Sequence, residues 1–545
     1  MTAGRAGFLL AVSLVLAAAC HRDSPQSTTD PCAEFALRSD VGGLGVAQGL
    51  ATYSKPVITA MGPTGSTVTT PIRYAEIEVL SCQSGGVLAS GATDADGRFR
   101  ITFSNPGRVG VYARVLSSSS RYPVSVQRSA AEPFVYGLAS TVFDDAGDGE
   151  TVTVSGLDAV EAVGAGVFNI LEQGLRGSET VESLTGSAPT APLVWHWYPG
   201  NPVGTSYTTA TRVITVLGTD DDADEFDDPV LLHEYGHYVL DVYSRDDSPG
   251  GPHALGESSL DLRLAWSEGW ADFFSSVARN DPQHTDTGNG EVLLSFNIET
   301  PPTLGEGTRY DTNELAIAAA LWDAHDASDA DEGAGVLNGL LARIWSVVRG
   351  LTAQPVTFED FWTDWQAANP GDFQPILADL QIDLWPDGWE AGANDDDPSR
   401  PTPISLYSGT NPSAIQHHTL YPAGDVDYVT FTAPVTGTYT VATSRCAPLG
   451  GGCVARVSNA ADTILDVLGV TPADASTVDN LTGRTYPASC GGSTCPPNSA
   501  STLSSKITFP AVAGASYVIR VARSPDAPPS AGETGSYDIV VTEGP

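Results

Sequence analysis

Two histidines four residues apart, His233 and His237, constrain the possible folds of this chain more than any other feature of its 545 residues. They lie in the segment HEYGH, which follows Asp228 and Pro229. Asp is favoured at the N-cap of a helix and Pro at its first position, so we predict a helix over residues 228–243 with Asp228 as its cap. One helical turn separates the two histidines, so both rings leave the same face of that helix.

Two neutral imidazoles in this arrangement can bind one Zn²⁺, at about 2.0–2.1 Å from each nitrogen. Glu234 follows the first histidine, where its carboxylate can take a proton from a metal-activated water that attacks a carbonyl group. His-Glu-x-x-His on a helix is a specific pattern for this chemistry. The chain has nine histidines in all, so a chance pair on a surface helix is the weaker interpretation.

A catalytic zinc needs a third protein ligand and one open position. The best candidate is Glu268, in a helix that we expect over residues 261–278. Asp272 lies one turn further along, on the same face as Glu268 and away from the aromatic packing face. Two buried carboxylates are costly unless a cation or a histidine N–H compensates them. We therefore assign Glu268 as a ligand and Asp272 as the hydrogen-bond partner of a ligand histidine. A solvated acidic edge is the alternative.

The segments HEYGH and SEGWADFF together resemble the gluzincin peptidases, particularly the fungalysin-like and thermolysin-like families. The resemblance implies that His233, His237 and Glu268 are zinc ligands. It also implies that Glu234 is the general base and that Asp272 supports a ligand histidine. A member of these families would be an endopeptidase acting on proteins or peptides.

One part of the family pattern is missing. These families place a histidine that stabilises the transition state before a later helix, which corresponds here to residues 313–323. Asp311 stands at that position, so we assign the role of oxyanion donor to its neighbour Tyr310. The other candidates, each of which can instead be a surface or packing residue, are His253, Arg309 and His325.

The pattern of apolar residues predicts a multidomain chain. Alternating runs with turn signals occupy residues 51–140 and 391–545, which indicates a β-sandwich at each end. The first resembles transthyretin-like and carboxypeptidase-regulatory-like (Ig-like) β-domains, and the second resembles the bacterial pre-peptidase C-terminal domain. Residues 141–390 hold a few strands followed by amphipathic helices. We expect them to form an α+β zincin-like zinc metallopeptidase domain with a mainly helical C-terminal lobe. The later helices are expected over residues 313–325, 335–348 and 358–368.

The N-terminus predicts export. Residues 1–20 have the basic start, short apolar run and small residues of a signal peptide, and they end at Cys20 as in a lipoprotein box. We expect an outer-membrane or cell-surface lipoprotein, or a secreted protein, with residues 21–50 as a polar tether. No later stretch is apolar enough to be a transmembrane helix. The other cysteines suit an oxidising compartment, with the expected pairs Cys32–Cys82, Cys446–Cys453 and Cys490–Cys495.

The charge of the chain limits its partners. Its formal net charge is −40, and it contains two lysines, which argues against nucleic acid and anionic lipid surfaces as partners. Since 41% of residues are hydrophobic, we expect a folded acidic protein. The acidic run at residues 220–228 either binds Ca²⁺ or is a solvated loop that favours the helix N-terminus. The aromatic strand at residues 195–198 either lines a substrate cleft or packs in a sheet.

Two functions are consistent with these features. The first is a secreted or surface-anchored zinc-dependent endopeptidase with Glu234 as general base. The alternative is a catalytically inactive surface binding or adhesion protein on a zincin scaffold, with the β-sandwiches as binding modules. A glutamate beside two histidines has no purpose in an inactive domain and favours the enzyme, whereas the missing family histidine favours the alternative.

Overall fold

The computed structural model has two compact units, Met1–Tyr243 with Ala271–Asn297 and Ser244–Trp270 with Ile298–Pro545. Among the residues described, no helix is both long and apolar enough to cross a membrane. The predicted signal peptide, Cys20 and most of the tether lie outside the described residues. The structure describes residues 32, 42–143, 147–160, 162–255, 260–300, 311, 313–326, 340–351, 356–368, 376–377, 380, 382, 395–408, 414–421, 424–444, 446–449, 452–455, 463–468, 476–478, 505–524 and 535–544.

The first unit begins with strands in which buried and exposed residues alternate, as the two faces of a strand require. In Arg98–Asn105 every second residue is buried. Residues 43–50, which we expected in the tether, form a strand instead. The strands of this part are β1 (Gly43–Leu50), β2 (Thr52–Thr59), β3 (Gly62–Pro71), β4 (Ala75–Ser81), β5 (Val87–Ala92), β6 (Arg98–Asn105), β7 (Val111–Ser119), β8 (Val124–Gln127), β9 (Gly137–Ala139), β10 (Thr151–Val154) and β11 (Asp158–Ala159).

The later strands of the first unit extend one of these sheets. The eight-stranded sheet has the order β13-β14-β12-β8-β7-β4-β5, with β9 on β7, while β10-β1-β6 and β11-β2-β3 form two smaller sheets. One sheet therefore includes strands from both sides of residue 140, where we expected a domain boundary. A disulfide joins Cys32 to Cys82, as expected. The later strands are β12 (Leu193–His196), β13 (Ser206–Thr208), β14 (Val213–Thr215), β15 (Gly218–Thr219), β16 (Asp222–Ala223), β17 (Gln283–Gly288) and β18 (Glu291–Asn297).

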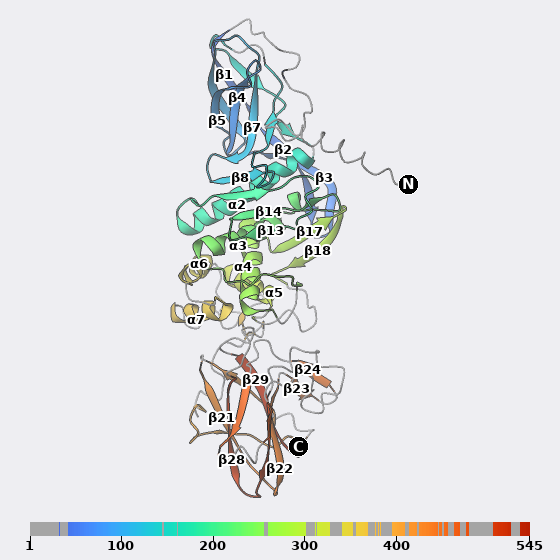
Figure 1. Cartoon of the computed structure of the whole chain (residues 1–545), viewed down its shortest axis with the longest axis vertical. Coiled ribbons are helices and arrows are strands. Elements are labelled where there is room, and N and C mark those ends of the chain that lie inside the picture. Colours follow the sequence, from blue (N-terminus) through green and yellow to red (C-terminus); the bar gives the residue numbers. More distant parts are fainter. Residues whose placement is uncertain are drawn as a thin grey trace, which may run out of the picture. The chain divides into compact units, whose positions relative to one another are not determined.

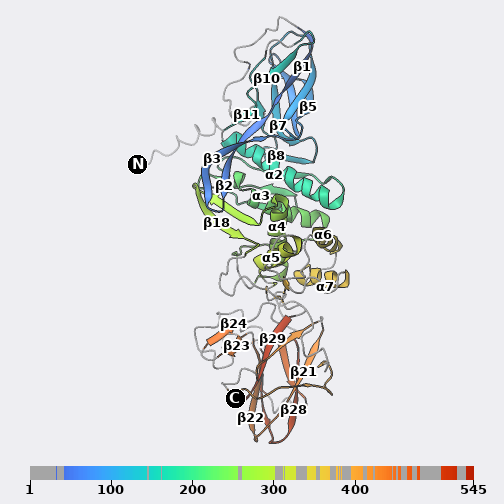
Figure 2. The same ribbon diagram turned by 180° about the vertical axis from the view of Figure 1, so that it is seen from behind.

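The next helical segments along the chain are α2 (Ala162–Thr185), the 3₁₀ turn η1 (Asp224–Phe226), α3 (Asp228–Tyr243) and α4 (Leu262–Arg279). Helix α2 contacts β7 and β8, and both views of the ribbon show it beside β8 (Figures 1 and 2). Helix α3 contacts α2 on one side and β17 on another. The helices that we predicted over 228–243 and 261–278 are confirmed to within one residue at each end.

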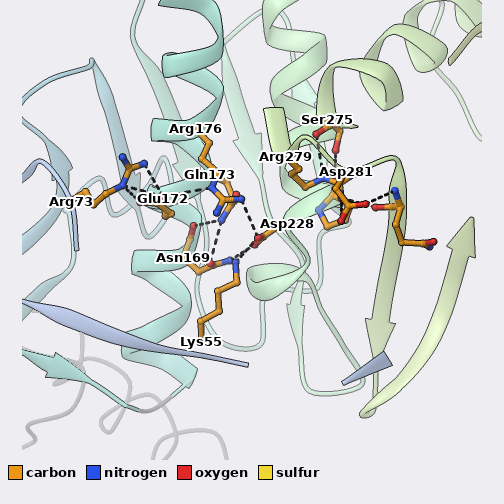
Figure 3. A network of polar contacts seen from close by, with 12 residues as sticks. Lys55, Arg73, Asn169, Glu172, Gln173, Arg176, Asp228, Ser275, Arg279 and Asp281 are labelled. Atoms are coloured by element: carbon orange, nitrogen blue, oxygen red, sulfur yellow. Dashed lines mark hydrogen bonds and ion pairs between the residues drawn. The ribbon is translucent and has the colours of Figure 1, made fainter. Parts of the chain in front are cut away.

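A polar network holds the start of α3 (Figure 3). Asp228 is the first residue of the helix and not the residue before it, where we had predicted the cap. It accepts a hydrogen bond from Asn169 Nδ2 of α2 at 3.0 Å and pairs with Lys55 of β2. Further along α2, Glu172 pairs with Arg73 at 2.8 Å. These contacts connect β2, α2 and α3 and set the position from which the two histidines project.

In the part of the second unit that the structure describes, the further named helices are α5 (Glu314–His325), α6 (Leu341–Gly350) and α7 (Phe358–Ala368). The predicted helices over 313–325 and 358–368 are confirmed, with Asn313 as the cap of α5. The helix that we predicted from residue 335 begins later, at Leu341. Aromatic rings of α4 and α7 pack together, with Trp266 and Phe361 stacked at 5.4 Å between centroids. The buried indoles and phenyl rings form an apolar core beneath α4.

The C-terminal part of the second unit is built from strands. Two sheets, β19-β21-β28-β25 and β20-β29-β22-β27-β26, enclose one hydrophobic cluster that includes Val429, Tyr439 and Ile519. A short hairpin, β23-β24, carries Cys446 and Cys453; Cys490 and Cys495 lie outside the described residues. The strands are β19 (Thr402–Pro403), β20 (Gln416–Leu420), β21 (Val426–Thr432), β22 (Gly437–Ser444), β23 (Cys446–Leu449), β24 (Gly452–Ala455), β25 (Thr463–Val467), β26 (Ser476–Val478), β27 (Lys506–Ala511), β28 (Ser516–Arg523) and β29 (Gly535–Glu543).

Candidate metal centre

The two histidines of α3 face each other through the same ring nitrogen. Their Nε2 atoms lie 3.2 Å apart. Two nitrogens bound to one tetrahedral ion at about 2.0–2.1 Å would be about 3.3 Å apart, so the pair has the spacing that zinc requires. His233 Nδ1 lies 2.8 Å from Asp272 Oδ1 of α4. If Nδ1 carries the proton and donates it to this carboxylate, the lone pair of His233 Nε2 points to the position between the two rings.

Helix α4 supplies the third candidate ligand. Single ligand atoms of His233, His237 and Glu268 lie within 4.8 Å of one another. Glu268 and Asp272 are one turn apart on α4, and both are at least nine-tenths buried. Buried carboxylates need compensation, and the donor set of two imidazoles and one carboxylate is one that zinc accepts. The residues present therefore fit a zinc ion held by these three side chains, with Asp272 orienting one of them.

Small residues allow α3 and α4 to come close. A Cβ atom at Gly236 would lie 2.7 Å from Ala271 Cα and 3.2 Å from Ala271 Cβ, closer than side-chain atoms normally pack. Gly236 sits between the two histidines in sequence, and Ala271 precedes Asp272. The close approach of the two backbones thus sets the 2.8 Å contact between His233 and Asp272.

Glu234 lies at the edge of a sheet. Its side chain is buried, and Oε2 accepts a hydrogen bond of 2.6 Å from the backbone N–H of Tyr207. Tyr207 belongs to β13, which pairs with β14 on one side and is the last strand in its sheet among the residues that the structure describes. The N–H of Tyr207 therefore points away from β14 and toward α3. The sequence pattern did not identify this contact, because three-residue β13 has no alternation to reveal it.

The aromatic strand that we considered as a cleft wall is an interior strand. β12 pairs with β8 on one side and with β14 on the other. Trp195 and Trp197 are fully buried. These side chains belong to the sheet packing, as the second of our two interpretations had it. The exposed edge near Glu234 belongs to β13 instead.

A histidine that the sequence analysis missed lies beside Asp272. His284 of β17 is stacked on Phe296 at 4.6 Å between ring centroids, and its Nδ1 is 3.8 Å from Asp272 Oδ1. Burial lowers the pKa of His284 to about 3, so it is neutral at pH 7 and does not neutralise Asp272. The segment QHTDTG has no apolar residue and contains no signal for this contact.

Of the candidates for the oxyanion donor, Tyr310 and Arg309 lie outside the described residues. His325 is in the last turn of α5, half-buried against Trp322, as a packing residue would be. His253 lies close to the predicted ligand of α4, with Nε2 3.8 Å from Glu268 Oε2 and 3.3 Å from Glu314 Oε2. The neighbouring carboxylate of Glu314 raises the pKa of His253 to about 9. No spacing rule in the sequence connects His253 to α5.

Two carboxylates of the acidic run at residues 220–228 lie in a cluster with a third carboxylate from β17. Ligand atoms of Asp222, Asp224 and Asp286 lie within 4.8 Å of one another. Burial and the neighbouring carboxylates raise the pKa of Asp224 to about 7 and that of Asp227 to about 8. Thr287 donates from its backbone N–H, at 3.0 Å, and from its hydroxyl to Asp227. The predicted Ca²⁺ remains a prediction; the run is not a fully solvated loop.

Comparison with known proteins relates the middle of the chain to proteases. Residues 180–375 match the family model of the Mycolysin C-terminal domain, which covers a little over a third of the chain and includes α3, α4 and α5. The match supports a relation to a protease family whose members are zinc metalloproteases.

Two further comparisons add little about function. An uncharacterized protein of Archaeoglobus fulgidus is 35% identical over 125 residues, which are 21% of this chain and 34% of that protein. The chain thus spans about a third of that relative's length. A 9R-lipoxygenase from Cyanothece aligns at 15% identity over 42% of this chain and 24% of its own, with a TM-score of 0.13. A likeness this low says nothing about the fold.

Proposed function

We propose that the chain is an exported zinc-dependent endopeptidase. The observation that carries the proposal is the convergence of His233, His237 and Glu268, whose ligand atoms lie within 4.8 Å of one another while Asp272 hydrogen-bonds to His233. The match of residues 180–375 to a protease family supports it. A zinc ion bound by these side chains would act as a Lewis acid and lower the pKa of a water at its open position.

Residues of this chain would transfer the proton and bind the substrate. Glu234 follows a ligand histidine on α3 and is placed to accept the proton of the attacking water and later to return it to the leaving amine. β13 presents its outer backbone groups beside this carboxylate, as the hydrogen bond from Tyr207 shows. An extended peptide could add to that edge as a further strand, which is a common mode of peptide binding. The 2.6 Å hydrogen bond from Tyr207 N–H to Glu234 Oε2 would then have to break when substrate binds.

The test combines metal analysis with peptide hydrolysis by the full chain. We expect one zinc per chain, hydrolysis of casein that a chelator abolishes, and recovery on adding zinc. Glu234→Gln should retain zinc and lose about 10²–10⁴-fold in rate, since an amide cannot accept the proton. Glu150→Gln, at an exposed position, is the matched control. Zinc without hydrolysis in the wild type would favour the inactive binding protein, and absence of zinc would refute the metal centre itself.

A further inference from the structure

The edge strand β13 is held against α3 by a side chain as well as by its backbone. The hydroxyl of Tyr207 donates a hydrogen bond of 2.7 Å to Oδ2 of Asp241, further along α3 than Glu234. The ring of Tyr207 also packs edge-on against Tyr238, with 6.1 Å between ring centroids. Positions 234, 238 and 241 are spaced by four and three residues, so they lie on one face of α3. Tyr207 therefore contacts one continuous stripe of this helix.

The contacts of Tyr207 are important because β13 has little other support. It is three residues long, and among the residues that the structure describes it pairs with β14 alone. Ser206 and Thr208 are exposed, as is the turn that follows. The start of the strand is tied by Thr205, whose hydroxyl accepts a hydrogen bond of 2.9 Å from the backbone N–H of Leu217. Beyond that point, the side chain of Tyr207 connects the strand to the helix.

The groups that form this connection are themselves held in place. Asp241 is partly buried, and Arg212 from the turn after β13 approaches the same Oδ2 atom, with its Nε at 3.4 Å. The hydroxyl of Tyr238 donates to the carbonyl oxygen of Ala191 at 2.8 Å. Burial, followed by the hydrogen bond to Asp241, raises the pKa of Tyr207, so the phenol keeps its proton and remains a donor at neutral pH.

We propose that Tyr207 and Asp241 are positioning residues for substrate. This role rests on the proposed function, in which an extended peptide adds to the outer edge of β13 and the N–H of Tyr207 exchanges Glu234 for a substrate carbonyl. The exchange removes the 2.6 Å backbone contact between β13 and α3 when the strand must stay in place. The side-chain hydrogen bond to Asp241 uses none of the outer backbone groups, so it can persist and hold the strand while substrate binds. The same exchange releases Glu234 to act on the attacking water.

The experiment compares KM and kcat of the full zinc-loaded chain on a fluorogenic casein peptide. Tyr207→Phe removes the hydroxyl and keeps the ring that packs on Tyr238, while Asp241→Ala removes the acceptor. We expect each change to raise KM about 5–20-fold, the effect of one hydrogen bond, with kcat changed less than about twofold. Asp241→Asn keeps an oxygen that can accept the bond and should restore most of the affinity. The double variant of Tyr207→Phe and Asp241→Ala should resemble either single variant, because both remove the same contact.

The control variant is Tyr198→Phe, which removes a phenol hydroxyl elsewhere in the same unit. The guanidinium of Arg128 lies over the ring of Tyr198, 4.6 Å from its centroid, and this contact does not need the hydroxyl. We expect wild-type KM in this variant. Zinc content and Tm are measured for every variant and should not change. A rise in KM that is accompanied by loss of zinc or a lowered Tm would show a structural role in place of a positioning role.

A second measurement needs no hydrolysis: fluorescence anisotropy of a labelled casein peptide bound to the full chain in the presence of a chelator. Weaker peptide binding by Tyr207→Phe would support the role of Tyr207 even if the wild type cuts no peptide, an outcome that refutes the proposed function alone. An active wild type with unchanged KM and peptide affinity in Tyr207→Phe and Asp241→Ala would overturn the positioning role alone. A wild type that neither binds nor cuts peptide would overturn both.

Discussion

Substitution of Gly236 by alanine tests whether the distance between α3 and α4 holds the metal centre together. The added Cβ would lie 2.7 Å from Ala271 Cα, whereas ordinary carbon contacts are about 3.5–4.0 Å. The obstructing atom is backbone, so a side-chain rotation cannot relieve the clash. The two helices must therefore separate by about 1 Å at this point.

The consequence for the site can be worked out from the 2.8 Å contact of His233 Nδ1 with Asp272 Oδ1. A displacement of about 1 Å stretches it beyond the range of a hydrogen bond. Loss of such a carboxylate–histidine contact typically weakens metal binding about 10–100-fold. Overpacking costs about 1–3 kcal/mol, and the helix preference of alanine over glycine offsets about 1 kcal/mol of this. Zinc affinity should thus fall much more clearly than the free energy of unfolding.

The assay is competition for zinc against a chromophoric chelator, combined with thermal unfolding. Gly350→Ala is the matched control: Gly350 ends α6, and a Cβ there meets nothing within 4 Å. We expect the control to have wild-type zinc affinity and unchanged or slightly raised Tm. If Gly236→Ala also has wild-type zinc affinity and Tm, the helix spacing is not set by this contact and the reasoning is wrong.

Three further changes test the neighbourhood of the site. Asp272→Ala should weaken zinc binding about 10–100-fold without unfolding the chain. Unchanged zinc affinity would show that Asp272 does not support a ligand histidine. Tyr310→Phe should lower kcat at least about tenfold with little change in KM or zinc content, and a parallel His253→Gln that shows this defect in its place would move the role to His253. The raised pKa of Asp227 means that the folded state binds its proton more tightly, so this group's stabilisation is lost as pH rises from about 4 to about 8. Urea midpoints at pH 5 and pH 8 should therefore differ less in Asp227→Asn than in the wild type, and an equal difference would contradict the assignment.

The sequence predicted the helices of the site well because their signals are local. Asp228, Pro229 and the apolar periodicity set the limits of α3, and Glu268 and Asp272 share a face of α4 through helical geometry alone. The expected ligand atoms are therefore close together once two helices pack side by side. The glycine that permits this packing was not singled out, because only the partner helix shows why Gly236 has no side chain.

The same reasoning could not predict contacts between segments that are distant in the sequence. His284 approaches Asp272 from β17, and His253 reaches Glu314 across more than 60 residues of sequence. β13 lies at a sheet edge beside Glu234, but three residues carry no periodicity from which a strand could be predicted. The sheet that crosses residue 140 was hidden for a related reason. Strand alternation identifies a strand but does not tell which strand it pairs with.

One physical rule nevertheless applies both to local sequence signals and to contacts between distant segments. A carboxylate taken out of water must find a donor or a cation. In the apolar helix around Trp266 and Trp270 that rule predicted a histidine partner for Asp272 before any distance was known, and the structure places His233 at 2.8 Å. Asp395 lies in a polar run that indicates nothing about burial, so the rule could be applied only after the fold showed 0% exposure. The Asp272 substitution therefore tests this argument at the place where the sequence alone could make it.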